Sequence, residues 1–308
     1  MKSIPWLSYL ALAAAMAIVG GYVGFSKALV IVFPVFVLAW LRFAIAAVAM
    51  APWLRRPASE APLDARMRRL LFLESFFGNF LFSICLLFGI SHSSALAAGV
   101  IMAAIPAVVA LLSWLLLREK VSLRVAAGIA CAIAGIALVA LARDAEGELA
   151  SGSLVGSVLL LGAVTCEALY VVIGKKLAAQ IGPRRISALI NLWGLVLVTP
   201  FAVWQAIGFH FAFIDSSYWA LLVAYAILAS IATVWLWMTG LKHVPAAQAG
   251  VFTVFLPVSA ATVGVLVFGE DFTAAQIGAF ALALAGVVLA SLPGSARPKD
   301  AGTWPPPS

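Results

Sequence analysis

Three charged side chains lie deep within long apolar stretches of the sequence, where an ionised group is costly. Arg42, Glu74 and Glu167 are each surrounded by enough apolar residues to cross a bilayer as a helix. At a rise of about 1.5 Å per residue, both carboxylates fall within reach of an extended arginine side chain. We expect an ion pair between Arg42 and one of the carboxylates, because lone charges inside a bilayer are rare. The alternatives are a carboxylate that takes up and releases a proton, and a Glu74 side chain that reaches the membrane interface.

Polar and aromatic side chains recur at helical spacing near these charges. Side chains four residues apart lie on one face of a helix, so each set forms a stripe. A stripe of this kind either hydrogen-bonds a neighbouring helix or lines a path for a small amphipathic solute. The residues expected to meet such a solute are Tyr22, Asn79, Phe82, Ser83, Tyr170, Thr233 and Trp237.

Two prolines lie in the middle of apolar stretches, where each interrupts helical hydrogen bonding. Proline removes one backbone hydrogen bond and frees the carbonyl group four residues earlier, here those of Met102 and Thr253. Irregular backbone at bilayer depth persists only where protein or a wet cavity covers it. A simple packing kink is the alternative interpretation. The residues added to the expected solute site are Gly99, Met102, Pro106, Thr253 and Pro257.

The sequence lacks the motifs of several other classes of protein. There is no G-x-x-x-x-G-K-[ST] phosphate loop, which argues against direct use of ATP, and no H-E-x-x-H pair of a metalloprotease. The three histidines are isolated from one another, and the three cysteines show no metal-binding spacing. We therefore expect no enzymatic activity, no cofactor and no metal ion.

Membrane-spanning helices must hold these residues in place. Hydrophobic residues make up 65% of the 308-residue chain and charged residues 10%, with a mean hydropathy of +1.13. Soluble domains carry about 25% charged residues, and unbroken apolar runs differ from the alternating pattern of a membrane β-barrel. The sequence predicts an all-α integral membrane protein with ten transmembrane helices, near 7–28, 30–53, 70–90, 93–117, 122–142, 153–174, 186–207, 217–240, 245–268 and 273–292.

The net charge of +7 reflects membrane topology rather than a nucleic-acid partner. When loops are assigned alternately to the two sides of the membrane, sixteen Lys and Arg residues fall on one side and two on the other. Basic loops remain in the cytoplasm of the cell. We expect an integral protein of the bacterial inner membrane with both termini in the cytoplasm, with membrane lipid as a partner and no nucleic acid.

The second half of the chain repeats the first. Residues 92–138 and 243–289 share 14 identities over 47 positions at a constant offset of 151, more than an alanine-rich composition explains. Because five helices is an odd number, the second copy must enter the membrane from the opposite side. The expected units are a five-helix repeat at 1–148, a second five-helix repeat at 149–292 and a disordered cytoplasmic tail at 293–308.

Matching residues of the two copies face opposite compartments in this arrangement. Glu119 matches Glu270 at the offset of 151, and Lys27 matches Lys175 at an offset of 148. One member of each pair falls on the cytoplasmic side and the other on the outer side. This relation is what inverted-topology repeats around a central cavity require.

Glycines in the fifth and tenth stretches indicate close contact between helices. Gly128 and Gly135 lie in the fifth stretch, and Gly278 and Gly286 lie in the tenth. Small residues at such spacing let helix backbones approach one another. We expect these glycines to hold each half together or to pair with a second copy of the chain, so a homodimer is one expected assembly.

The sequence resembles a known family of transporters. The residues that carry the resemblance are the segment 34–43, which ends in Arg42-Phe43, and the Gly-x6-Pro units of the fourth and ninth stretches, each followed by Glu119 or Glu270. They look like the EamA family of the drug/metabolite transporter superfamily, over about residues 7–292. The resemblance implies two inverted five-helix repeats around a central cavity and export of small metabolites by alternating access. Glu167 departs from the family pattern, since relatives usually carry an apolar or aromatic residue there.

This resemblance leads to one main hypothesis and two alternatives. The main hypothesis is an exporter of small metabolites, above all neutral and aromatic amino acids, which the resemblance to bacterial amino-acid exporters favours. A multidrug or lipid-precursor carrier of the same superfamily is the first alternative, and a carboxylate unpaired by Arg42 would favour a cationic substrate. A membrane receptor or assembly protein that transports nothing is the second.

Overall fold

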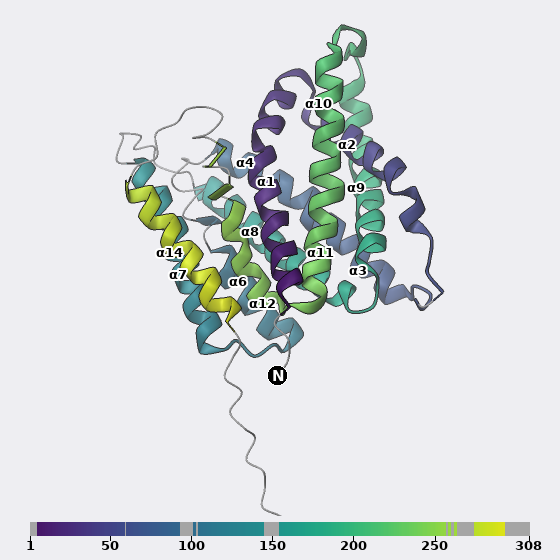
Figure 1. Ribbon diagram of the computed structural model, residues 1–308. Coiled ribbons are helices and arrows are strands. Elements are labelled where there is room, and N and C mark those ends of the chain that lie inside the picture. Colours follow the sequence, from purple (N-terminus) through teal and green to yellow (C-terminus); the bar gives the residue numbers. More distant parts are fainter. Residues whose placement is uncertain are drawn as a thin grey trace, which may run out of the picture.

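The structure is a computed structural model that describes residues 5–58, 60–92, 101–102, 104–144, 154–256, 258–259, 262–263 and 274–292. Within these residues every regular element is helical (Figure 1). The α-helices are α1 (Trp6–Val32), α2 (Val35–Ala49), α3 (Ala65–Ser75), α4 (Phe82–Ser91), α6 (Ile105–Leu112), α7 (Leu123–Asp144), α8 (Leu154–Ala178), α9 (Pro183–Ala206), α10 (Ser216–Ala226), α11 (Thr233–His243), α12 (Ala246–Val251) and α14 (Ala274–Ser291). Shorter turns are η1 (Ala51–Leu54), η2 (Phe76–Leu81), η3 (Ser113–Leu117), η4 (Phe211–Phe213), η5 (Ile227–Ala232) and η6 (Phe252–Val254).

Four of the described helices are long and apolar enough to cross a membrane, namely Ala65–Leu86, Leu154–Ala178, Pro183–Ala206 and Ser216–His243. Five shorter apolar helices accompany them in the described parts of the chain. The all-helical prediction is therefore confirmed for the described residues, while the number of ten spans stays a prediction.

Two of the long helices contain a π-helical turn at matching positions. The turn η2 joins α3 to α4, and the turn η5 joins α10 to α11, so each helix runs on through its wider turn. The turns begin at Phe76 and Ile227 and end at Leu81 and Ala232, a separation of 151 in each case. This separation equals the offset of the internal sequence match, and π-turns are concentrated at functional positions in helices.

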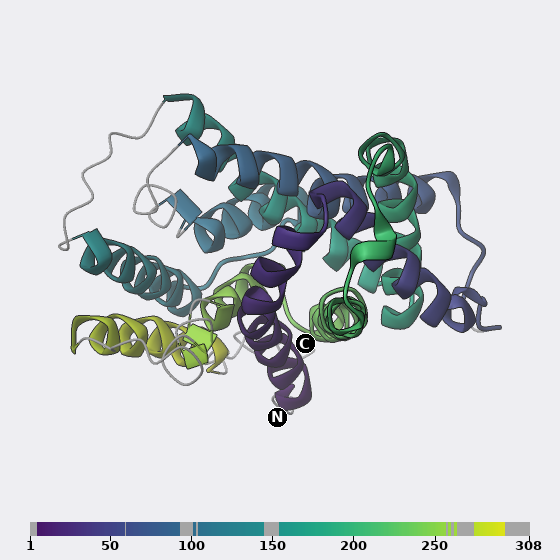
Figure 2. The same cartoon turned by 90° about the horizontal axis from the view of Figure 1, so that it is seen from above.

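The helices pack in pairs that relate the two halves of the chain. Helix α7 packs along α14, and α2 packs along α9. Helix α1 packs along α11, and α8 packs along α4. Seen from above, α7 and α14 lie side by side at one edge of the bundle, away from α10 (Figure 2). In the internal repeat, α1 corresponds to α8 and α4 corresponds to α11. The contact of α1 with α11 is therefore repeated by the contact of α8 with α4.

Glycines make the contact between α7 and α14 close. A Cβ atom added to Gly128 would lie 2.7 Å from the carbonyl oxygen of Gly286, and one added to Gly135 would lie 2.6 Å from that of Ala279. A Cβ atom on Gly278 would meet nothing within 4 Å. The prediction that these glycines hold each half to itself was therefore wrong, because Gly128, Gly135 and Gly286 join α7 of the first half to α14 of the second.

The helices that match the proline-containing stretches are short and irregular. Before Pro106, the N–H of Ala104 donates to the carbonyl oxygen of Ile101 across 3.0 Å, and α6 begins one residue later. In the second half, α12 ends at Val251 and passes into the 3-10 turn η6. Both elements are thus interrupted next to the residues whose carbonyl groups a proline was expected to free.

Large apolar side chains cover the outside of the bundle. Leu7 is 83% exposed, Ile31 84% and Val48 79%. The largest buried cluster includes Leu12, Val171 and Trp237 from α1, α8 and α11. Apolar surface of this extent is unfavourable in water and is typical of a face that contacts lipid.

Candidate functional site

The predicted ion pair of Arg42 is absent from the structure. The guanidinium of Arg42 lies 4.4 Å from the ring centre of Phe43 and 5.8 Å from that of Tyr225 on α10. No carboxylate is paired with it among the described residues. The prediction was wrong because these two rings hold the arginine on the side of α2 and α10, whereas the carboxylates lie on α3 and α8.

Glu74 is the most completely enclosed of the charged residues. It is 0% exposed, and neither of its carboxylate oxygens has a hydrogen-bond partner in the part of the chain that the structure describes. A Cβ atom added to Gly174 on α8 would lie 2.7 Å from Oε1 of Glu74 and 3.2 Å from side-chain atoms of Met238 and Leu241. Glu74 therefore lies between α3, α8 and α11 and does not reach the membrane interface.

Glu167 differs from Glu74 because the residue is half-buried rather than completely enclosed. It interacts electrostatically with Glu74, with Tyr170 one turn further along α8, and with Tyr22 on α1. No ion pair or hydrogen bond joins Glu167 to another described residue. Among the described residues, neither Glu74 nor Glu167 has a basic partner.

Tyr22 links the arginine to this acidic region. Its ring meets that of Tyr225 edge to face, with ring centres 5.3 Å apart, and it interacts electrostatically with both Arg42 and Glu167. Tyr225 was missed by the sequence analysis, because nothing in its position along the chain marks it as a neighbour of Tyr22. Tyr22 thus interacts with two of the three charged residues that the sequence singled out, and Glu74 interacts with Glu167 and Tyr170 instead.

Tyr170 lies against the helix that contains the first π-turn. A Cβ atom on Gly78 would overlap the Tyr170 ring, with a distance of 2.2 Å to Cδ2. Gly78 lies in η2, beside Asn79. A glycine is required at this position because the ring of Tyr170 packs directly on the backbone.

The polar stripe on α3, η2 and α4 uses most of its hydrogen-bonding groups within the protein. The Ser75 hydroxyl donates to the carbonyl oxygen of Ile190 across 2.8 Å, and the Asn79 side chain donates to the Ser75 hydroxyl across 3.3 Å. The Ser83 hydroxyl donates to the carbonyl oxygen of Asn79 across 2.7 Å. Phe82 is half-buried beside them. In this conformation the stripe joins α3 to α9 at Ser75 and leaves Ser83 exposed.

The matching stripe on α11 is enclosed. Trp237 is 1% exposed and Thr233 7%, so neither offers surface to a solute in this conformation. The indole N–H of Trp237 and the hydroxyl of Thr233 have no hydrogen-bond partner. Buried polar groups without partners are uncommon in proteins. Both side chains therefore have unused hydrogen-bonding capacity inside the bundle.

The remaining predicted site residues lie on the interrupted helices. Pro106 is buried in the first turn of α6, and Met102 is half-buried before it. The Thr253 hydroxyl donates to the carbonyl oxygen of Gly250 across 2.8 Å. Gly99 and Pro257 lie outside the described residues.

One end of the bundle, which we call the basic end, carries the loops rich in lysine and arginine. Lys175, at the end of α8, donates hydrogen bonds of 2.7 Å to the carbonyl oxygens of Leu241 and Val244, where α11 ends. The carbonyl groups at the end of a helix carry partial negative charge and attract a cation. Lys175 therefore fastens α8 to α11.

Glu119 makes a complementary contact at the same end. Its carboxylate accepts hydrogen bonds from the backbone N–H groups of Ala246, across 3.1 Å, and Ala247, across 3.3 Å. These groups begin α12, where a carboxylate is favoured by the helix dipole. Glu119 also interacts electrostatically with Lys175. Both residues belong to pairs that the internal sequence match had identified, and that match was the signal for them.

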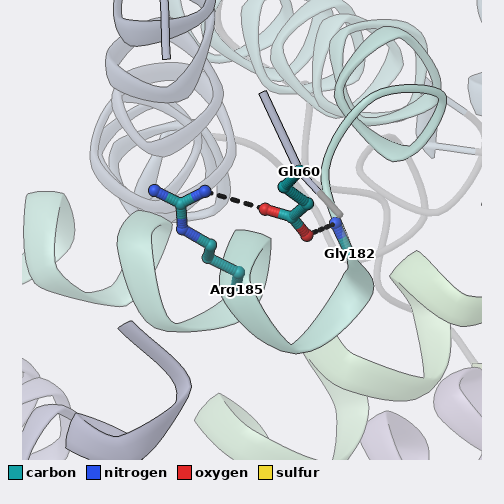
Figure 3. A network of polar contacts seen from close by, with 3 residues as sticks. All are labelled: Glu60, Gly182 and Arg185. Atoms are coloured by element: carbon teal, nitrogen blue, oxygen red, sulfur yellow. Dashed lines mark hydrogen bonds and ion pairs between the residues drawn. The ribbon is translucent and has the colours of Figure 1, made fainter. Parts of the chain in front are cut away.

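A third contact at the basic end holds the loop between α2 and α3 (Figure 3). Glu60 accepts a hydrogen bond of 2.7 Å from the N–H of Gly182, the residue that caps α9, and one of 2.7 Å from the Arg185 guanidinium. Both side chains of this ion pair are largely buried. Glu60 is not among the expected site residues, because one glutamate in a charged loop has no distinguishing pattern in the sequence.

These features define an integral membrane protein with charged and polar groups enclosed among apolar helices, as in a transporter. The sequence matches the EamA-like transporter family over residues 6–141 and again over residues 154–292. The chain belongs to the EamA-like transporter family, and is thus a transporter rather than an enzyme. A curated relative, "Uncharacterized transporter YetK" from Bacillus subtilis (strain 168), is 33% identical over 281 residues, which cover 91% of this chain and 85% of the relative.

The fold also matches a solved crystal structure. That structure aligns with a TM-score of 0.73 at 18% sequence identity, over 92% of this chain and 96% of the other. At this level of identity the likeness shows the fold alone.

Proposed function

We propose that this transporter exports small polar metabolites, above all neutral and aromatic amino acids, from the cytoplasm by alternating access. The observation that carries the proposal is the group of charges inside the bundle that the protein leaves unpaired. A charge at the centre of a membrane helix costs about 3 kcal/mol on insertion scales. A protein that retains Arg42, Glu74 and Glu167 without ion pairs uses them for a solute or a proton.

Several relations between the halves support two inverted repeats, 1–148 and 149–292, followed by a cytoplasmic tail at 293–308. The family matches the chain in two segments, the π-turns recur 151 residues apart, and α7 packs on its counterpart α14. Inverted repeats are typical of transporters whose substrate site lies between the halves near the bilayer midplane. We place the solute between α1, α3, α8 and α10, where Tyr22, Tyr170 and the charged residues lie.

The contacts at the basic end bear on the direction of access. By the positive-inside rule, we expect this end and both termini on the cytoplasmic side of a bacterial inner membrane. Lys175 holds α8 to α11. Glu119, which follows α6 and η3, is hydrogen-bonded to the start of α12. We propose that these contacts close the cytoplasmic entrance and that both break when the solute enters.

A second candidate function is export of organic cations. Glu74 and Glu167 without a basic partner favour it, because a cationic drug needs a carboxylate that is not already neutralised. Arg42 argues against export of organic cations, because its guanidinium would repel a cation. Tyr22 interacts electrostatically with this guanidinium and with Glu167, so both charges act on the same region. A solute that carries charges of both signs fits this interior better.

The experiment that tests the proposal is counterflow in liposomes that contain the purified protein. The labelled panel contains neutral and aromatic amino acids, a nucleoside, a sugar and a cationic dye. We expect exchange of amino acids above that of protein-free liposomes. Exchange of the dye with none of the amino acids would assign the second function, and exchange of no solute would contradict transport of this class.

A further inference from the structure

Arg42 and Glu167 both act electrostatically on Tyr22 but are not paired with each other among the described residues. Both interact electrostatically with Tyr22, whose ring lies against that of Tyr225. Oppositely charged side chains inside a membrane protein are expected to pair. Here the aromatic contacts of Arg42 keep it apart from Glu167, so the interior presents a positive and a negative group with Tyr22 as their common neighbour.

We propose that Arg42 and Glu167 form the two poles of a site for a zwitterion, in which Arg42 binds the carboxylate and Glu167 the ammonium group of an amino acid. This inference rests on the proposed function and makes it more specific. It assigns each charged group of the substrate to one side chain of the protein. It also predicts that a solute lacking either charge is a poor substrate.

The contacts of Arg42 leave its hydrogen-bonding edge available. Its guanidinium lies near the rings of Phe43 and Tyr225, which engage it through cation–π attraction. The N–H groups of arginine lie in the plane of the guanidinium and form a fork that fits a carboxylate. None of these donors is used by another described residue. The positive pole is therefore positioned by aromatic rings while its donors remain free.

The carboxyl groups of Glu74 and Glu167 are both candidates for the negative pole, and the two residues differ in how deeply they are buried. Glu74 is 0% exposed and is packed against Gly174, so a solute cannot reach it in this conformation. Glu167 is half-buried and shares Tyr22 with Arg42. Glu167 is thus the carboxylate that meets the ammonium group, while Glu74 stays enclosed between α3, α8 and α11.

A site with two charged poles distinguishes an amino acid from analogues that lack one of its charges, because such an analogue leaves one protein side chain unpaired. An amino acid amide keeps the ammonium group that binds Glu167 but leaves Arg42 without a carboxylate. A des-amino acid keeps the carboxylate that binds Arg42 but leaves Glu167 without an ammonium group. Sites built to bind a polar group reject analogues that lack it, because the buried protein group is then left unpaired. Discrimination against both analogues is the signature of this arrangement, whereas a cation site or an anion site rejects only one of them.

The test uses wild-type protein in liposomes and three related compounds. We would compare an aromatic amino acid that the protein exchanges with its amide and with its des-amino acid, as competitors of counterflow. We expect both analogues to compete at least about tenfold more weakly than the amino acid. Equal competition by either analogue would overturn the assignment of the pole that the analogue lacks. This comparison uses the wild-type protein alone, so its result does not depend on the folding of a variant.

Substitutions then assign the poles to residues. In Arg42→Met we expect the preference for the amino acid over its amide to fall by about tenfold, with the preference over the des-amino acid retained. In Glu167→Gln we expect the opposite change. Arg184→Met is the control for removing a positive charge, because Arg184 lies over Trp53 and Trp235 at the basic end.

The outcomes separate this inference from the proposed function. Exchange of amino acids with unchanged preferences in Arg42→Met and Glu167→Gln would overturn the two-pole site and leave amino-acid export standing. Exchange of a dye or sugar but of no amino acid would contradict the proposed function and the site together. Loss of both preferences in the Arg184→Met control would show that any lost charge has this effect, and would also overturn the assignment.

Discussion

The ammonium group of Lys175 donates a hydrogen bond of 2.7 Å to the carbonyl oxygen of Leu241. The same ammonium donates to Val244 across 2.7 Å, so one side chain binds the last carbonyl groups of α11 from the end of α8. Leu241 also lies next to Gly174, the residue that contacts Glu74. The contact that fastens the two helices at the basic end is therefore adjacent to the enclosed carboxyl group.

The first prediction concerns this contact. Lys175→Met removes charge-assisted hydrogen bonds to a helix end and should lower the free energy of unfolding by about 2 kcal/mol. If the contact closes the cytoplasmic entrance, the substitution should also make Cys166, which is buried on α8, react faster with a maleimide added to inside-out vesicles. Thermal unfolding in detergent and labelling rates measure the two effects.

The neighbouring lysine gives a matched control for that substitution. Lys176→Met changes the charge by the same amount on the same helix, and Lys176 makes no hydrogen bond or ion pair with other described residues. We expect it to leave stability and labelling unchanged. Equal effects of the two variants would mean that the charge at the end of α8 matters, and not the contact with α11.

A second prediction tests the carboxylate at the start of α12. Glu119→Gln keeps one acceptor oxygen but loses the charge, whereas Glu119→Ala leaves the N–H groups of Ala246 and Ala247 without this partner. Loss of a helix cap costs about 1 kcal/mol. We expect stability to fall in the order wild type, Gln, Ala, as measured by thermal unfolding. A Gln variant less stable than the Ala variant would contradict a capping role.

The sequence was sufficient to predict the class of fold but not the pairing of its charges. Apolar runs and their length can be read from the sequence, and the π-turns, which were not predicted, recur at the same offset of 151 as the internal match. The partner of Arg42 depends on where its side chain points across the bundle. That direction is set by Phe43 and by Tyr225 on α10, which are far apart in the sequence. Distance along the helix axis alone suggested an ion pair that is not formed.

The glycines show the same limit on sequence reasoning. Small residues in two stretches correctly indicated close helix contact, because only a missing side chain permits it. Which helices meet is decided by the packing of the whole bundle, and here Gly128 faces Gly286 of the other half. A periodic pattern identifies a contact face and leaves its partner open.

These glycines provide a third prediction with an internal control. Gly128→Ala places a Cβ atom 2.7 Å from the carbonyl oxygen of Gly286, and such overpacking costs about 1–3 kcal/mol. Gly278→Ala meets nothing within 4 Å and should stabilise its helix by about 0.5–1 kcal/mol. Thermal unfolding of the two variants should therefore shift in opposite directions. Shifts in the same direction would mean that α7 and α14 pack differently.

A fourth prediction concerns the loop that Glu60 holds against α9. Removing either member of a largely buried ion pair is expected to cost more than removing both, so Glu60→Gln and Arg185→Met should show coupling of about 1–3 kcal/mol. Loss of the contact should also free the loop, and trypsin should cleave more rapidly after Arg55, whose following residue is not proline. Double-mutant unfolding energies and cleavage rates test this. Additive effects would show that the pair is energetically independent.

The last prediction addresses Glu74. Its two carboxylate oxygens are buried without partners, and a buried polar group left unsatisfied costs about 1–3 kcal/mol. A residue kept only for structure would lose stability on substitution. We expect instead that Glu74→Gln, which removes the chance of ionisation, leaves stability equal or higher while it lowers the rate of counterflow.

This opposite movement of stability and flux separates the two roles of Glu74. If the carboxyl group accepts and releases a proton during the cycle, the amide cannot replace it, and exchange driven by a proton gradient should fall while binding of substrate at equilibrium remains. Glu167 and Tyr170 are titratable groups that interact with Glu74, so Glu167→Gln must be compared under the same gradient. A Glu74→Gln protein that unfolds more easily yet transports at the wild-type rate would assign Glu74 to packing alone.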